Sequence, residues 1–216
     1  MNLIDVLARD KIDETLTGRV YGVVTGVVVS IDDPDESGRV KVAFPWLKDD
    51  QESPWARVMT FMAGNDRGAL FRPEVDDEVL VLFDHGDMRF PYIIGALWNG
   101  RDVVPSEGGS NADNHVRLIK SRSGHIIKLD DTPGSEKIEI TDKTGNNTIL
   151  IDTASNTVTI STDADIRVQA PNGKLLLEGS EVGIKSSGSV KMEAGSTMDV
   201  EAGGTMNISG ATVNIN

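Results

Sequence analysis

Apolar and polar residues alternate regularly over the C-terminal half of the chain. Pairs of apolar residues separated by a single residue recur from residue 116 to the end, and the residue between them is often polar, as in "VKM", "MDV" and "MNI". In a β-strand, residues i and i+2 face the same side, so each pair places two apolar side chains on one face. The pattern predicts a series of short strands, each with one apolar face.

The spacing of these pairs changes along this half. The first four pairs start at residues 116, 127, 138 and 149, whereas from residue 158 onward the mean step is close to 8 residues. A fixed short period is the signature of a stacked β architecture. The apolar pairs from residue 158 onward are predicted to form the core of this stacked, needle-like structure. They are Val158, Ile160, Ile166, Val168, Leu175, Leu177, Val182, Ile184, Val190, Met192, Met198, Val200, Met206, Ile208, Val213 and Ile215.

Glycines precede several of the later pairs by two or three residues. A sharp bend at such a position needs a residue without a Cβ atom. We therefore predict that Gly188, Gly195, Gly204 and Gly210 form corners between consecutive strands.

Residues 18–98 follow a different pattern, in which β-branched and alternating segments are separated by turns rich in Gly, Asp and Pro. Segments such as "RVYGVVTGVVVSI", "RVKVAFPWL" and "DDEVLVLFDHGDMRFPYIIGALW" predict about five strands. Short strands with tight turns suit a small closed barrel such as an OB-fold. We predict a short helix or packed arm over residues 1–17, because apolar residues recur there at roughly helical spacing, and a linker over residues 99–114.

Acidic turns raise the question of metal binding. The turn "DDPDESG" gathers carboxylates but lacks the spacing of an EF-hand calcium loop. Asp, Pro and Gly are ordinary turn residues, which favours a solvated turn, and His85 in "DHGD" is interpreted in the same way. We predict no metal site and no cofactor. It stays open at this stage whether His115 and His125 face an axis shared by several copies.

Composition narrows the classes of function. A net charge of −13 disfavours nucleic-acid binding, which needs clustered Lys and Arg. No cysteine is present, so disulfides and thiolate metal sites are excluded. The N-terminus lacks the apolar core of a signal peptide, and no apolar run is long enough to span a bilayer, so synthesis in the cytosol is expected.

The aromatic residues are confined to one half of the chain. All ten of them lie between Tyr21 and Trp98. Two small apolar side chains per eight residues are too few to fill a solenoid made by one chain, which usually has longer repeats. Three identical chains wound together would supply three faces around a narrow axis. The C-terminal half, residues 115–216, is therefore predicted to be an intertwined triple-stranded β-helix, and the protein an all-β homotrimer.

Four blocks of the sequence occur in a characteristic order: "GRVKVAFPWL", "SPWARV", "RPEVDDEVLVLFDHGDMRFPYIIGALWNG" and "IKSRSGHIIKLDDTPGSEKIEITDKTGNNTILID". They resemble the family of baseplate assembly protein V and VgrG spikes, the central spikes of contractile phage tails and related injection machines. The resemblance implies an OB-fold collar, a triple-stranded β-helix needle and a mechanical role: membrane puncturing at the front of the tube, with no enzymatic activity.

The resemblance also implies partners and a location. It implies docking on a separate trimeric hub protein, a PAAR-type protein at the tip, and contact with the target cell envelope on firing. Assembly is expected in the cytoplasm, into the baseplate of a phage tail or injection particle. The short stretch at residues 99–114 leaves no room for the lysozyme domain that some spikes carry between barrel and needle.

Two other classes of function are weaker alternatives. A β-helical enzyme that degrades polysaccharides would use paired carboxylates, and acidic residues abound. However, residues 99–216 have no aromatic residue on which a sugar could stack. An OB-fold module for single-stranded nucleic acid needs a basic groove, which the acidic balance disfavours.

Overall fold

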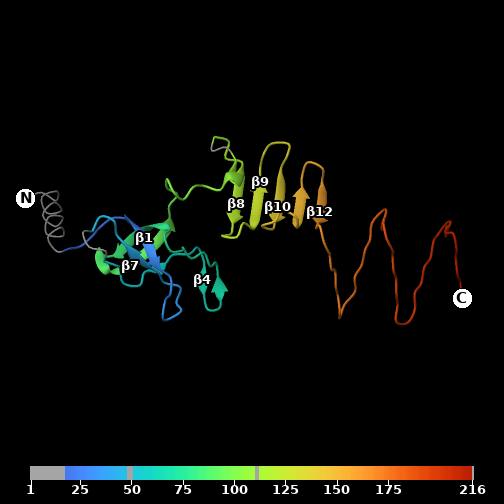
Figure 1. Ribbon diagram of the computed structural model, residues 1–216, viewed down its shortest axis with the longest axis horizontal. Helices are drawn as coiled ribbons and strands as arrows, with labels where there is room; N and C mark the ends of the chain where they lie inside the picture. The colour runs from blue at the N-terminus through green and yellow to red at the C-terminus, as the bar shows by residue number, and fades with distance from the viewer. Residues whose placement is uncertain (1–17, 48–50, 110–111, 216) are drawn as a thin grey trace, which may run out of the picture. The chain divides into compact units, whose positions relative to one another are not determined.

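The computed structural model describes residues 18–47, 51–109 and 112–215, so the arm predicted for residues 1–17 lies outside the described residues. The described chain contains β-strands and one short 3-10 turn, which confirms the predicted all-β class (Figure 1). In chain order the elements are β1 (Val24–Ser30), β2 (Lys41–Ala43), β3 (Arg57–Val58), β4 (Ala63–Gly64), β5 (Arg67–Gly68), β6 (Glu78–Asp84), β7 (Asp87–Ala96), η1 (Ser106–Gly108), β8 (Val116–Lys120), β9 (Ile126–Asp130), β10 (Lys137–Thr141), β11 (Thr148–Asp152) and β12 (Thr157–Ser161).

The N-terminal strands form one five-stranded sheet in the order β2-β1-β6-β7-β3. Its two ends approach each other through a bridge between Val40 and Ala56. β3 runs parallel to β7, whereas the other neighbours are antiparallel. Bridging the two edges curls the sheet toward a barrel and protects its backbone groups from pairing with other chains.

Buried and exposed residues alternate along the strands of this sheet, and the buried ones form its core. In β6, Val79, Val81 and Phe83 are buried, while the residues between them are partly or fully exposed. Phe44 packs against Phe83 with the ring centroids 5.7 Å apart. The buried apolar residues of the core are Val28, Val40, Val42, Phe44, Ala56, Val79, Val81, Phe83 and Ile93.

The turn "DDPDESG" is a turn as predicted, but its central carboxylate is buried and not solvated. The side chain of Asp33 is only 1% exposed. It accepts hydrogen bonds from the backbone N–H groups of Asp35, Ser37 and Arg39 at 3.2, 2.9 and 3.2 Å. The Arg39 guanidinium donates to it as well, with Nη2 2.6 Å from Oδ1. One carboxylate therefore organises the whole turn.

We expect Asp33→Ala to lower the melting temperature of the protein at pH 7, because three backbone N–H groups lose their acceptor. The hydrogen bond from Arg39, followed by those from the backbone amides, holds the pKa of Asp33 well below its usual range. A depressed pKa stabilises the fold above the unfolded value of about 3.9 and loses that stabilisation as the pH falls below it. Thermal unfolding should therefore separate wild type from variant clearly at pH 7, and less so near pH 2.

A matched control for this experiment is Asp35→Ala, since the Asp35 side chain is 70% exposed. It should change the melting temperature little. Equal losses in the two variants would contradict the anchoring role of Asp33.

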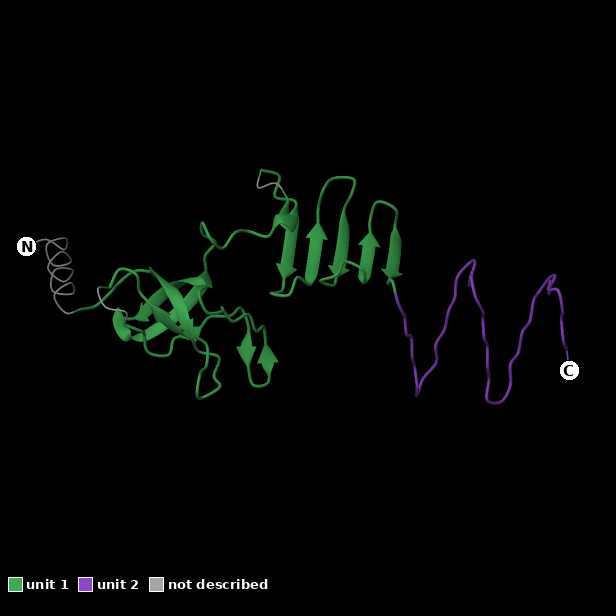
Figure 2. Cartoon of the chain, viewed as in Figure 1, with its two compact units in different colours: residues 1–163 green, residues 164–216 purple. Residues whose placement is uncertain are grey.

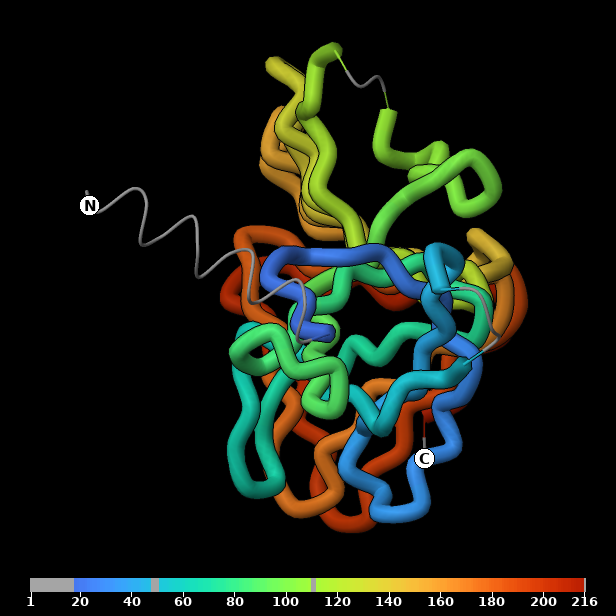
Figure 3. Tube along the Cα trace, turned by 90° about the vertical axis from the view of Figure 1, so that its left-hand side faces the viewer, coloured from blue at the N-terminus to red at the C-terminus, as the bar shows by residue number. Residues whose placement is uncertain are grey.

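The strands β8–β12 form a second five-stranded sheet in sequence order, an antiparallel meander. In Figure 3 the five strands lie one behind another. Five-residue strands joined by turns explain why the apolar pairs are spaced more widely here than after residue 158. The turns are held by side chains: hydrogen bonds from Asn147 and Thr144 lower the pKa of Asp142, between β10 and β11, to about 2.

The chain divides into two compact units, residues 1–163 and 164–216 (Figure 2). The first contains both sheets. In the second, no strand is formed within residues 164–215, which run as extended segments joined by bends (Figure 1). Within one chain, the strands of residues 116–161 thus pair with one another. The eight-residue repeats of residues 164–215 form no strand.

Candidate assembly surfaces

One face of the β8–β12 sheet is apolar and uncovered. The register places apolar residues opposite one another across β9–β12, in two rows: Leu129–Ile138–Ile151–Val158 and Ile127–Ile140–Ile149–Ile160. These eight side chains are 41–69% exposed. Soluble monomers rarely expose a contiguous apolar patch of this kind, so the face, named here the apolar sheet face, is a candidate contact surface.

The first apolar pair of the series lies on the other face of this sheet. The spacing predicts that Val116 and Leu118 share one face of their strand. In the structure Ile119 is opposite Ile127, whereas Leu118 is opposite Lys128. Val116 and Leu118 thus share one face of their strand, as predicted, but pairing with β9 turns that face away from the apolar rows.

The opposite face of the sheet carries charged and hydroxyl side chains together with four apolar ones, Val116, Leu118, Ile126 and Leu150. Lys128 Nζ lies 3.3 Å from Glu139 Oε2 on the neighbouring strand. Desolvation raises the pKa of Glu139, but hydrogen bonds from Thr141 and Lys128 outweigh it, and the net shift is downward. Cross-strand pairs of opposite charge stabilise a sheet and suit a face in contact with water. The sheet therefore has one face formed by two apolar rows and one face that holds its cross-strand ion pairs.

The predicted needle residues continue the apolar pattern beyond β12. The apolar pairs from Ile166 to Ile215 are 45–85% exposed in the single chain. The chain bends at residues 187–188, 195–196, 203–204 and 211, so Gly188, Gly195 and Gly204 lie in bends and Gly210 directly precedes one. Lys191, between Val190 and Met192, pairs with Glu193 at 2.6 Å. Whether these residues form corners and the core of a needle stays a prediction.

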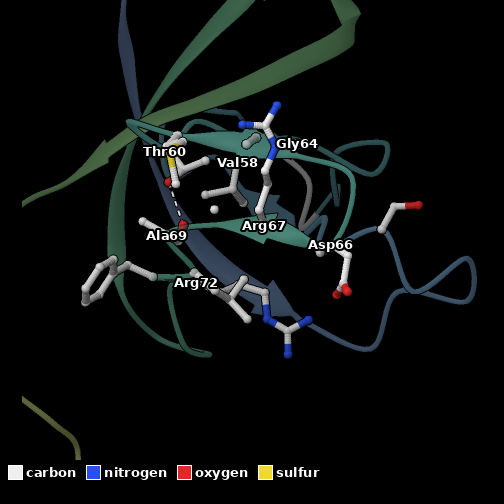
Figure 4. A pocket seen from close by; sticks show the side chains of 14 residues that line it. Val58, Thr60, Gly64, Asp66, Arg67, Ala69 and Arg72 are labelled. Carbon is white, nitrogen blue, oxygen red and sulfur yellow. Dashed lines mark hydrogen bonds between the residues drawn. The ribbon is translucent and has the colours of Figure 1, made fainter.

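The N-terminal half carries a second exposed apolar surface, on the hairpin β4–β5 and its flanks. We name it the hairpin patch; it comprises Met59, Phe61, Met62, Leu70, Phe71 and Val75. The hairpin also lines an open pocket of about 420 Å³ (Figure 4). Thr60 Oγ1 donates to the carbonyl of Ala69 at 2.6 Å and ties the two arms together. No sequence pattern singled this patch out, although "TFMAGNDRGALF" contains most of its residues.

The residues considered as ligands do not gather in the described structure. No group of three or more His, Asp or Glu side chains that could hold a metal ion occurs among the described residues. His85 lies at the β6–β7 turn with its side chain 93% exposed. His125 Nδ1 accepts a hydrogen bond from the Lys143 backbone N–H at 3.2 Å. In the described part of the chain, no helix has the length and apolarity that a membrane span requires.

Comparison with known proteins identifies the N-terminal sheet of the chain. Residues 24–98 match the family model of the type VI secretion system/phage-baseplate injector OB domain. The chain is similar to the type VI secretion system spike protein VgrG1a of Pseudomonas aeruginosa, with 34% identity over 116 residues, covering 49% of this chain and 18% of that protein. VgrG5 of the same organism is 35% identical over 124 residues, covering 54% and 16%.

A relative from a second organism gives the same result. VgrG3 of Vibrio cholerae is 32% identical over 111 residues, covering 48% of this chain and 11% of that protein. The chain thus spans less than a fifth of the length of these curated relatives. The resemblance drawn from the sequence blocks, to baseplate and VgrG-like spikes, is confirmed.

Proposed function

We propose that this chain is a structural component of a membrane-puncturing spike in a contractile tail or injection machine, because residues 24–98 match the injector OB-domain model and the chain is similar to VgrG spike proteins. The observation that carries the proposal is the apolar surface that one chain leaves uncovered. It includes the apolar sheet face and the eight-residue repeats that follow it in the sequence. Assembly along the whole C-terminal half would bury this surface.

The proposed assembly is a homotrimer. Three apolar sheet faces turned toward a common axis would form a closed three-sided core, and each ionic face would then contact water. The apolar pairs beyond β12 would continue that core as an intertwined triple-stranded β-helix, and their backbone groups would pair between chains. Closure of this kind removes exposed strand edges, which otherwise template aggregation.

Interwound chains suit a mechanical task. A strand hydrogen-bonded to neighbouring chains cannot unfold alone, so force on the needle is shared by three chains. The net charge of −13 per chain favours solubility and disfavours attraction to anionic membranes. In this role no residue has to perform chemistry. The relatives carry the name spike protein, which supports a structural role over the polysaccharide-degrading alternative.

Partners and location follow from the same proposal. The OB domains would dock on a trimeric hub, the far end of the needle would take a PAAR-type tip protein, and the assembled particle would meet the target cell envelope on firing. The chain would be assembled into a baseplate in the cytoplasm.

The proposal is tested by the native mass of the purified protein, measured by light scattering beside an unheated SDS gel. We expect a native mass three times the chain mass of 23.2 kDa, and a band that resists SDS. A folded monomer of 23.2 kDa would overturn the proposal, since the apolar surface would then need no second chain.

A further inference from the structure

Residues 99–109, which connect the N-terminal sheet to the second sheet, begin with a hydrogen-bonded turn. The Asn99 backbone N–H donates to the Asp102 carbonyl at 2.9 Å, and Asn99 Oδ1 accepts from the Asp102 backbone N–H at 2.7 Å. Asn99 Nδ2 also donates to Glu78 Oε2, on the first residue of β6, at 2.9 Å. The start of the connecting segment is therefore fastened to the N-terminal sheet.

The later part of the segment lies against the second sheet. η1 packs on β8. Lys120 Nζ, on β8, donates to Glu107 Oε1, in η1, at 2.6 Å, and each of the two side chains is only about one-third exposed. This hydrogen bond lowers the pKa of Glu107. Because water is partly excluded from the pair, it holds η1 on β8 more firmly than a fully exposed pair would.

The same segment lies beside the apolar pair of β8. Val104 and Pro105 line a cavity of about 290 Å³ together with Val116 and Leu118. Val116 and Leu118 are half-buried, whereas the eight residues of the two apolar rows are exposed. The connecting segment thus supplies apolar neighbours on the face to which β8 turns this pair, away from the rows.

We infer that residues 99–109 form a strap that couples the N-terminal sheet to the second sheet, in place of a flexible tether. One end of the strap is held at β6 and the other at β8, and only Val103 and Val104 separate the Asn99 turn from Pro105. A flexible tether would leave the two sheets free to move and to unfold separately.

The strap stands on contacts within one chain, whereas its mechanical purpose rests on the proposed function. In a spike driven by force, a stiff connection passes the load from the N-terminal sheet directly to the needle. The strap lies on the face of the second sheet that carries Lys120 and Leu118, opposite the face of the apolar rows. It therefore leaves the apolar sheet face free for the proposed trimer.

Hydrogen exchange of the native full-length protein tests whether the strap is folded. Mass spectrometry follows the peptides that cover residues 99–109. The amides of a flexible tether exchange at the rate of an unfolded chain, whereas those of a folded strap exchange only when it opens. We expect exchange about tenfold or more slower than in the unfolded protein. Exchange at the unfolded rate over the whole segment would overturn the inference.

Reversal of the ion pair tests what holds the strap on β8. Glu107→Lys and Lys120→Glu each replace the attraction with a repulsion and should speed exchange of residues 104–109 about fivefold, whereas the double variant should restore it. Asp113→Lys is the control, because it makes the same change of charge at an exposed position nearby and should leave the exchange unchanged. Failure of the double variant to restore protection would overturn the anchoring at β8.

Coupling between the two sheets is measured by tryptophan fluorescence. All aromatic residues lie between Tyr21 and Trp98, so fluorescence follows the N-terminal sheet alone. Lys120→Glu changes the second sheet, yet it should lower the melting temperature of the N-terminal sheet by about 3 °C or more, and the double variant should recover it. An unchanged fluorescence transition in Lys120→Glu would show that the sheets are independent.

The native mass separates the strap from the proposed function. A trimer in which residues 99–109 exchange freely leaves the proposed function standing and overturns the strap. A monomer of 23.2 kDa with a protected segment and rescue by the double variant overturns the proposed function and supports the strap.

Discussion

Ile149→Asp is expected to convert the proposed trimer into a monomer of 23.2 kDa. Ile149 lies in the middle of the apolar sheet face, opposite Ile140 and Ile160. It is 41% exposed in the single chain, so an aspartate there costs a monomer little. In the trimer, three carboxylates would meet in an apolar interior. Desolvating an unpaired charge costs several kcal/mol, and the three charges also repel one another. Light scattering at matched concentration measures the change.

The matched control is Thr148→Asp, one residue earlier on the same strand. Thr148 pairs with Thr141 and Ser161 on the opposite, ionic face, which the proposed trimer leaves in water. This variant should keep the mass of the wild type. If both variants remain trimeric, the apolar sheet face does not form the interface, and the trimer would have to be held elsewhere.

Val190→Asp is expected to abolish the SDS resistance that we predict for the proposed trimer. Val190 and Met192 belong to the eight-residue repeats, and in the proposed needle they face the axis. Three aspartates at one level of a narrow axis would introduce like charges that water cannot reach, and the interwound strands around them would separate. An unheated SDS gel of purified protein should then show the 23.2 kDa chain where the wild type shows the trimer.

The adjacent Lys191→Asp serves as the control for the needle. Lys191 is the next residue of the same repeat and faces outward in the proposed needle; in the single chain its side chain is 76% exposed and paired to Glu193. Its replacement should leave the SDS-resistant band intact. Loss of the band in both variants would show that the segment tolerates no added negative charge, and would contradict the assignment of an inner and an outer side.

Alternation of side chains was enough to predict most of the second sheet. The rows from Ile127 to Ile160 follow the apolar pairs of the sequence, although Ile126 of β9 and Leu150 of β11 lie on the other face of the sheet. In β8, "VRLIK", the apolar pair is Val116 and Leu118, but pairing with β9 shows that Ile119, and not Leu118, joins the rows. Alternation fixes the two faces of a strand, but the choice between them depends on the neighbour.

The turn at Asp33 and the hairpin β4–β5 also escaped the sequence pattern. An aspartate among "DDPDESG" has no local signal that marks it as buried, because burial arises when Arg39 and three backbone amides fold around it. Similarly, the structure divides the segment "WARVMTFMA" between β3 and β4, and its letters alone do not mark the break. Hydrogen bonds between residues distant in the sequence, such as Thr60 with Ala69, decide where a strand ends.

The sequence by itself determined the all-β class, the barrel-type N-terminal half, the change in period near residue 158 and the apolar pairs, since each depends on side chains two residues apart in one strand. Only the tertiary structure decided the strand order, the parallel pairing of β3 with β7, the face of β8, the burial of Asp33 and the exposed hairpin patch. These features depend on contacts between segments far apart in the chain, whose free energies no local pattern records.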